Sequence, residues 1–311
     1  MHALVEIHEE VHEALLERRP IVALESATLA HGPPFPGPVE TAAAVEKAVR
    51  EAGAIPATVG IADGRFVIGM DGVDIERFAT APADRVAKVS SRGIGAAIAS
   101  GGLGATTVAA ALVGAELAGI PVFATAGVGG VHRGAGGTYD VSADLTQFTR
   151  SKVAVVCAGA KSVLCVRPTL EYLETLGVPV IGYRCADFPA FYCRSSGLRN
   201  PQRMDDLADI ARALRTHWDL GLPGGALVTT PVDEAHALDR DEVASVLRRA
   251  LADADRAGIT GPGITPYLLT AVSRATGGAG DEAHRAVLVS TARTAGDLAV
   301  ALSRPPTRSQ P

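Results

Sequence analysis

The chain has 311 residues, of which 47% are hydrophobic and 20% are charged, so it can bury a substantial core and is not a disordered chain. Its net charge of -5, with no long basic run, excludes the electrostatic footprint of a nucleic-acid-binding protein. We therefore expect its partners to be small molecules or further copies of the same chain.

The first 20 residues are acidic, and their apolar residues have a helical spacing. This spacing predicts a helix whose apolar face consists of Leu4, Ile7, Val11, Leu15 and Leu16. The segment has neither the basic start nor the apolar stretch of a signal peptide. The most apolar region, 101–130, is interrupted by glycines, Pro121 and Glu116, so we expect no membrane span and a cytoplasmic location.

From residue 21 onward, apolar runs typical of strands alternate with helical patterns. The strand-like runs are 21–26, 57–62, 65–70, 120–127, 153–159, 178–183 and 225–230. The helical patterns are 39–53, 168–177, 204–221, 240–258, 265–276 and 282–303. Asp63-Gly64 predicts a hairpin between the second and third runs.

Strands that are apolar on both faces and separated by helices indicate a sheet that is covered on both sides. The hairpin makes this sheet mixed instead of wholly parallel. We predict a three-layer α/β/α fold with a mixed, mostly parallel central sheet and a helical C-terminal part. It would form one domain over residues 1–303, followed by a disordered tail at 304–311.

Polar residues that follow the strand-like runs are candidates for chemistry, because sites in open α/β sheets form outside the carboxyl ends of strands. Glu25 ends the first run among apolar neighbours and suits a general acid; alternatively, it caps backbone N–H groups. Lys88 is also flanked by apolar residues, or else is a salt-bridged surface lysine. The glycines before Thr106-Thr107 and a helical run favour an anion at a helix N-terminus.

A long glycine-rich segment, 124–148, carries little apolar content and several polar side chains. Long loops of this kind between strands are usually functional. Asp140 is a candidate ligand for a hard divalent cation, and Ser142 and Asp144 are candidates for binding the hydroxyls of a sugar. The alternative is that these residues form an Asx-turn and a helix N-cap.

Lys161 follows the apolar run 153–159, where an ammonium group is unexpected. The chain has 25 arginines and only four lysines, so a lysine in an apolar setting suggests a task that guanidinium cannot perform. An amine removed from water can attack a carbonyl carbon and form a Schiff base. The alternative is a lysine whose ammonium reaches out to solvent.

Several motifs follow one another along the chain, among them ALESATLAHG, GATTVAA, VFATAGVGGVHRGA, DVSADL and VAVVCAGAKS. They resemble, in the same order, those of the pseudouridine-5′-phosphate glycosidase family, whose relatives include indigoidine synthase A. The resemblance covers about residues 20–300. It implies cleavage of the C–C glycosidic bond of pseudouridine 5′-phosphate to uracil and ribose 5-phosphate, with Mn²⁺ or another divalent cation and a homotrimeric assembly.

The resemblance also implies roles for individual residues. Glu25 matches the proton donor, and Lys161 matches the nucleophile that forms a Schiff base with C1 of the ring-opened sugar. Asp140 matches the metal ligand. The positions that match substrate-binding residues are Lys88, Val108, Ser142, Ala143 and Asp144, and we expect His132 to face the same pocket.

The chain departs from the family near its C-terminus, where Ser290 and Thr291 occupy the place of paired asparagines that contribute to the site. Ala27 also stands where a threonine is usual. Two alternatives therefore stay open. One is a Schiff-base lyase acting on a different phosphorylated nucleoside or sugar in secondary metabolism, and the other is a noncatalytic protein that binds sugar phosphates.

Overall fold

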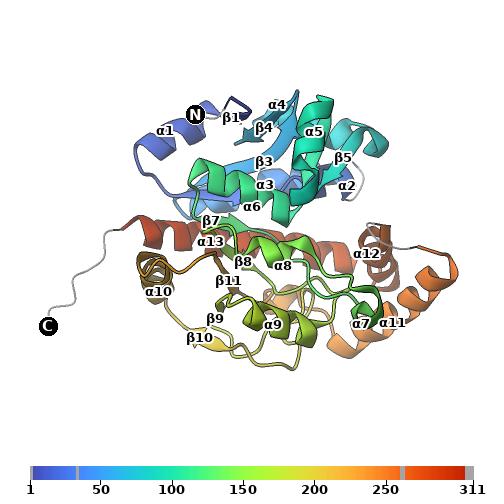
Figure 1. The fold of residues 1–311 in the computed structure, drawn as a ribbon. Coiled ribbons are helices and arrows are strands. Elements are labelled where there is room, and N and C mark those ends of the chain that lie inside the picture. The colour runs from blue at the N-terminus through green and yellow to red at the C-terminus, as the bar shows by residue number, and fades with distance from the viewer. Residues whose placement is uncertain (1–2, 33–34, 260–262, 305–311) are drawn as a thin grey trace, which may run out of the picture.

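The computed structural model describes residues 3–32, 35–259 and 263–304. Within these ranges eleven strands join into one sheet, in which most neighbouring strands are parallel (Figure 1). The strands are β1 (Val5–Ile7), β2 (Ile21–Leu24), β3 (Ile55–Ala62), β4 (Arg65–Ile68), β5 (Val86–Val89), β6 (Leu103–Thr106), β7 (Val122–Ala124), β8 (Ala154–Cys157), β9 (Val180–Tyr183), β10 (Gln202–Met204) and β11 (Ala226–Thr229). Their order is β1-β4-β3-β2-β7-β8-β11-β9-β10, with β6 paired to β3 and β5 to β6.

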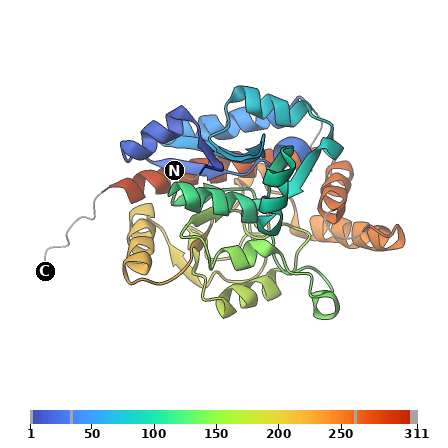
Figure 2. The same ribbon diagram turned by 45° about the horizontal axis from the view of Figure 1, so that its top comes forward.

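Helices cover both faces of this sheet (Figures 1 and 2). They are α1 (Glu9–Leu16), α2 (Ala27–His31), α3 (Gly37–Glu51), α4 (Gly72–Thr80), α5 (Ile94–Ser100), α6 (Val108–Ala118), α7 (Ala135–Thr138), α8 (Ala143–Gln147), α9 (Val166–Thr175), α10 (Leu207–Asp219), α11 (Arg240–Arg256), α12 (Ile264–Ala275) and α13 (Ala279–Ser303). On one face α13 packs between α3 and α10 and against β2, β7 and β8, while α6 packs beside α8 on the other. The predicted three-layer α/β/α fold with a mixed sheet and a helical C-terminal part is confirmed.

The predicted hairpin forms between β3 and β4, which pair antiparallel. Its two turn residues, Asp63 and Gly64, have φ values of 52° and 78°. Positive φ at both central residues is the geometry of the tight turns that match the twist of paired strands, and Asp-Gly tolerates it best. Local turn chemistry therefore places the antiparallel pair that makes the sheet mixed.

The prediction of a helix over the whole N-terminal segment is wrong in its first part. Val5–Ile7 forms the edge strand β1, which pairs parallel with β4, and only Glu9–Leu16 is helical. Of the predicted apolar face, Val11 is buried while Leu16 is 72% exposed. The unpaired edge of β4 offers hydrogen bonds that a helical pattern in the sequence does not reveal, and the β-branched Val5 and Ile7 suit a strand.

Strands β5 and β6 extend the sheet beyond β3 and, with α2 and α4, enclose a small apolar cluster separate from the main core. This cluster includes Leu29, Met70 and Phe78. The extension matters for the site because β5 carries Lys88 and β6 leads into α6. The sequence patterns did not predict either strand.

Among the described helices, α13 is the one whose length and apolar composition would suffice to cross a membrane. Its buried side chains face α3, α10 and the sheet, as in the core helix of a globular fold. The expected tail, 304–311, lies outside the described residues beyond Arg304.

Candidate active site

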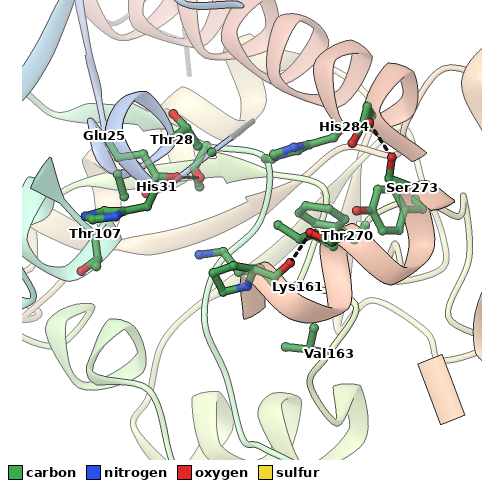
Figure 3. Close-up of a pocket in the computed structure, with 18 of the residues that line it drawn as sticks. Glu25, Thr28, His31, Thr107, Lys161, Val163, Thr270, Ser273 and His284 are labelled. Atoms are coloured by element: carbon green, nitrogen blue, oxygen red, sulfur yellow. Dashed lines mark hydrogen bonds between the residues drawn. The ribbon is translucent and has the colours of Figure 1, made fainter. Parts of the chain in front are cut away.

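A pocket of about 390 Å³ lies at the carboxyl ends of β2, β7 and β8. Glu25, Lys88 and Lys161 all line it, so the structure brings together three residues predicted from segments far apart in sequence. Figure 3 shows Glu25 and Lys161 on this pocket. Because β2, β7 and β8 are adjacent and parallel, the residues that follow them meet at the same edge of the sheet. A pocket with convergent polar groups at this position is the expected place for a ligand.

Glu25 follows β2 directly, and its carboxyl group is held by Thr125, which follows β7. Thr125 Oγ1 donates a 2.6 Å hydrogen bond to Glu25 Oε1. The next residue, Ser26, is fully buried and donates to the carbonyl of Val59, as does Thr106. These bonds fix the end of β2 to β3 and β6, so the carboxyl group of Glu25 projects from a rigid support.

Lys161 follows β8 after a short turn. Its backbone N–H donates to the carbonyl of Val128, and Gly159, with φ of 85°, lets the chain turn there. A Cβ atom at Gly159 would lie 2.3 Å from the carbonyl oxygen of Pro189, so no larger residue fits. The half-buried Lys161 side chain enters the pocket instead of continuing along the sheet (Figure 3).

Lys88 reaches the pocket from β5, on the extension of the sheet. Desolvation lowers the pKa of Lys88, and the positive charge of Lys161 lowers it further, while Glu25 and Asp144 oppose the shift. Two lysines and Arg274 therefore line a common space with two carboxylates, Glu25 and Asp281, which leaves a net positive charge. This balance favours an anionic ligand.

The wall beside Lys88 contains two polar atoms that are buried without a hydrogen-bond partner in the described part of the chain, His31 Nε2 and Thr107 Oγ1. Desolvation and the charge of Lys88 lower the pKa of His31. Thr107 is the N-cap of α6, whose first N–H groups have no partner within the helix. A buried polar atom normally has a partner, so this wall is suited to an anion or a hydroxyl group.

Asp144 is buried, and both of its carboxylate oxygens are occupied by backbone groups. Oδ1 accepts a 2.9 Å bond from the N–H of Ala109 in α6, and Oδ2 accepts a 2.7 Å bond from the N–H of Gly129. Ser142 caps α8 by accepting from the N–H of Asp144. Asp144 therefore joins the start of α6 to the glycine-rich loop.

Val108 and Ala143 are two further residues that we expect to contact the substrate. The side chain of Val108, the first residue of α6, is fully buried in the core, so a ligand could meet this residue only through its backbone. Ala143 is the first residue of α8. Neither residue is among those that line the pocket.

His132 and Asp140 lie together in the glycine-rich loop, outside the pocket lining. His132 Nδ1 is 3.8 Å from Asp140 Oδ2, and the side chain of Asp140 is 51% exposed. Among the described residues, no three His, Cys, Asp or Glu side chains lie close enough together to hold a metal ion. Asp140 can therefore hold a cation only if water or substrate supplies most of the ligands.

The structure does not bring Ser290 and Thr291 to the pocket. Both hydroxyl groups donate to the carbonyl of Val287 one turn earlier in α13. The same helix reaches the pocket through Asp281 and His284 instead.

Thr125, His31, His284 and Phe191 line the pocket but were not predicted from the sequence. Thr125 ends a strand-like run, so the rule that selected Glu25 could also have found it. His31 lies within the ALESATLAHG motif. Nothing in the local sequence distinguishes His284 from a histidine on the solvent-facing side of a helix.

The chain is similar to known proteins over nearly its whole length. A family model described as "Indigoidine synthase A like protein" matches residues 10–301. A pseudouridine-5′-phosphate glycosidase from Dickeya dadantii (strain 3937) is 56% identical over 300 residues, which cover 96% of this chain and 94% of the relative. A prealnumycin C-glycosynthase solved in complex with ribulose 5-phosphate is 50% identical, with a TM-score of 0.90 and coverage of 97% of this chain and 98% of that one. An indigoidine synthase A-like protein from Thermotoga maritima MSB8 is 32% identical, with a TM-score of 0.86 and coverage of 98% and 99%.

Proposed function

The chain belongs to the family of indigoidine synthase A-like proteins, and from this premise we propose that it is a pseudouridine-5′-phosphate glycosidase. The reaction is reversible cleavage of the C–C bond between uracil and ribose 5-phosphate. The observation that carries the proposal is the convergence of Glu25, Lys88 and Lys161 on one pocket. The names of relatives at 46–56% identity over nearly their full length support it.

A C–C glycosidic bond has no oxygen lone pair at which an ordinary glycosidase could protonate the leaving group. In the proposed reaction the Lys161 amine bonds to C1 while the ring oxygen leaves and takes a proton from Glu25. The Glu25 carboxylate takes the proton that the bonded Lys161 nitrogen loses and passes it to the uracil carbon, so that the nitrogen lone pair can expel uracil and leave an iminium at C1. Water hydrolyses this Schiff base, which releases ribose 5-phosphate and restores the amine.

The substrate phosphate is placed beside Lys88 in this proposal. The unpartnered Thr107 hydroxyl would supply a further donor at that wall. The backbone N–H of Val108 at the start of α6, which is not itself part of the lining, is proposed as another. Ser142, Ala143 and Asp144 would act on the substrate mainly by fixing the loop and α6.

We propose Asp140, with His132 beside it, as the protein's contribution to binding Mn²⁺ or another divalent cation, which water and substrate oxygens would complete. When bound, such a cation would supply positive charge to substrate oxygens. Asp140→Asn should raise the Mn²⁺ concentration needed for half-maximal activity by about tenfold or more in protein dialysed against chelator. Unchanged activity of the metal-free wild type would contradict a cation requirement.

The test of the function is release of uracil from pseudouridine 5′-phosphate, followed by chromatography with Mn²⁺ present. Absence of uracil at high enzyme concentration refutes the glycosidase. The role of Lys161 is tested separately by borohydride reduction in the presence of ribose 5-phosphate, which should add the sugar to the peptide that contains Lys161. Lys161→Arg should abolish labelling and turnover, while the matched variant Lys152→Arg, at an exposed site outside the pocket, should retain both.

The likeness to a C-glycosynthase supports a second candidate, in which the same Schiff base joins ribose 5-phosphate to another ring in secondary metabolism. Incubating the protein with ribose 5-phosphate and a panel of ring acceptors distinguishes the two, because only the second predicts faster coupling to a ring other than uracil. Tight binding of ribose 5-phosphate without any turnover would instead favour the noncatalytic alternative.

We further propose that the protein is a homotrimer and is located in the cytoplasm. A mass other than that of three chains in sedimentation equilibrium would reject the trimer.

A further inference from the structure

The wall of the pocket that faces the candidate catalytic groups is built by α12, α13 and the aromatic pair Phe191 and Tyr192. The inference that follows concerns this wall and rests on the proposed function. In that reaction C1 of the sugar carries Lys161 and the departing ring at the same time. The ring must therefore lie next to Lys161 in the part of the pocket that the sugar phosphate leaves free.

Phe191 is held on this wall in an unusual backbone conformation. Its φ is 62°, in the left-handed region, which costs about 1–2 kcal/mol for a bulky residue. Its N–H donates to the carbonyl of Ala158, and a Cβ at Gly127 would come within 2.6 Å of its ring. The surrounding backbone therefore fixes the ring of Phe191 beside the turn that leads to Lys161, and strain of this kind is concentrated at ligand sites.

His284 extends from α13 into the same space (Figure 3). Its ring packs on that of Phe191, with centroids 5.4 Å apart and planes inclined by 35°. Burial lowers the pKa of His284 to about 4, with a further contribution from Lys161 that Asp281 opposes. At neutral pH the imidazole is therefore uncharged and offers one N–H donor and one lone-pair acceptor.

The hydroxyl groups that α12 contributes to this wall already have partners. Thr270 Oγ1 donates 2.9 Å to the carbonyl of Pro266, and Ser273 Oγ donates 2.5 Å to Asp281 Oδ2. No hydrogen bond within the described ranges engages the ring nitrogens of His284. His284 and the hydroxyl group of Tyr192 are thus the groups on this wall that offer a ligand both a donor and an acceptor.

We propose that Phe191 and His284 form the subsite for the ring that C1 loses or gains, and that His284 determines which rings are accepted. Phe191 supplies an apolar surface against which a flat ring packs. His284 binds a ring edge that offers both an acceptor oxygen and an N–H or O–H donor. Uracil offers a carbonyl oxygen beside an N–H, and a hydroxylated aromatic ring offers both roles through its O–H groups.

Two variants separate this role from a structural one. His284→Phe keeps a flat side chain of similar size but removes both polar atoms, while His284→Asn restores a donor and an acceptor. In the uracil-release assay, we expect His284→Phe to raise the inhibition constant of uracil by about tenfold or more, with that of ribose 5-phosphate changed less than twofold. His284→Asn should return the uracil constant to within about threefold of wild type. His236→Phe, the same substitution at an exposed histidine outside the pocket, is the control and should change neither constant.

Equal changes in both inhibition constants, or an unchanged uracil constant in His284→Phe, overturn the proposal. If wild type releases no uracil, the glycosidase fails but the subsite is still tested. Wild type saturated with ribose 5-phosphate is then titrated with uracil and with 1,3-dihydroxynaphthalene in a calorimeter. Binding of either ring that His284→Phe loses supports the subsite, and binding of neither ring, or binding that His284→Phe retains, overturns it.

Discussion

The carboxylate of Asp144 joins the start of α6 to the glycine-rich loop. Of the contacts that support the site, we expect its removal to disturb the site most while leaving Glu25 and Lys161 in place. Asp144→Asn keeps the shape of the side chain but replaces one acceptor oxygen by an NH₂ group. That group would face the N–H of either Ala109 or Gly129, which now donate to the two oxygens. One buried N–H therefore loses its acceptor.

The magnitude follows from these two bonds. An unpartnered buried N–H costs about 1–3 kcal/mol, and the remaining bond loses about 1 kcal/mol because its acceptor is no longer charged. Asp144 is only 5% exposed, so water cannot replace the missing acceptor. We expect the free energy of unfolding to fall by about 2–4 kcal/mol.

Urea denaturation followed by circular dichroism measures this difference. The control is Asp205→Asn, the same chemical change in an exposed ion pair with Arg203, where the expected loss is below about 1 kcal/mol. If Asp144→Asn loses no more stability than Asp205→Asn, Asp144 does not hold α6 to the glycine-rich loop and the reasoning is refuted.

Three further outcomes follow from the geometry of the pocket. Thr125→Val removes the 2.6 Å hydrogen bond that orients Glu25. We expect kcat for uracil release to fall about 10- to 100-fold, while the inhibition constant of ribose 5-phosphate changes less than threefold. A change in KM alone would contradict this orienting role. Ser290→Ala should change kcat and KM less than twofold, since its hydroxyl bonds within α13, and a tenfold loss would mean that it reaches the substrate. The pKa of His284 in the folded chain is about 4, below the ordinary value of 6.5. Between these two pH values the unfolded chain binds more protons than the folded chain does. The contribution of His284 to the stability of the folded chain is therefore present above pH 6.5 and is lost as the pH falls toward 4. The melting temperature of wild type should therefore fall more between pH 7 and pH 4.5 than that of His284→Phe, and equal falls would contradict a buried neutral imidazole.

The sequence was sufficient to predict those features that depend only on residues close to one another along the chain. Asp63 and Gly64 determine their hairpin locally, and apolar runs over a few residues identify the central strands. Glu25 and Lys161 were found because the carboxyl ends of adjacent parallel strands must converge. Their catalytic roles remain predictions.

Features that depend on distant partners were missed or placed wrongly. Val5–Ile7 becomes a strand only because β4 presents an open edge, and β5 and β6 are short strands that exist through pairing with each other and with β3. On α13 the pocket is reached by His284, about two turns before Ser290, because the packing of this helix against α3, α10 and the sheet decides which of its turns meets the pocket.

The position of α13 also has a consequence for synthesis of the protein on the ribosome. This helix covers the face of β2, β7 and β8 and packs along α3, where Gly296 lies so close to Ala52 that an added Cβ would come within 2.6 Å of the Ala52 Cβ. These partners emerge from the ribosome well before α13, so the nascent chain exposes an apolar sheet face until nearly all of the described residues have been made. Chaperones that shield such surfaces would therefore be needed most while residues 120–280 are being translated, and the pocket can acquire its wall only in the last step.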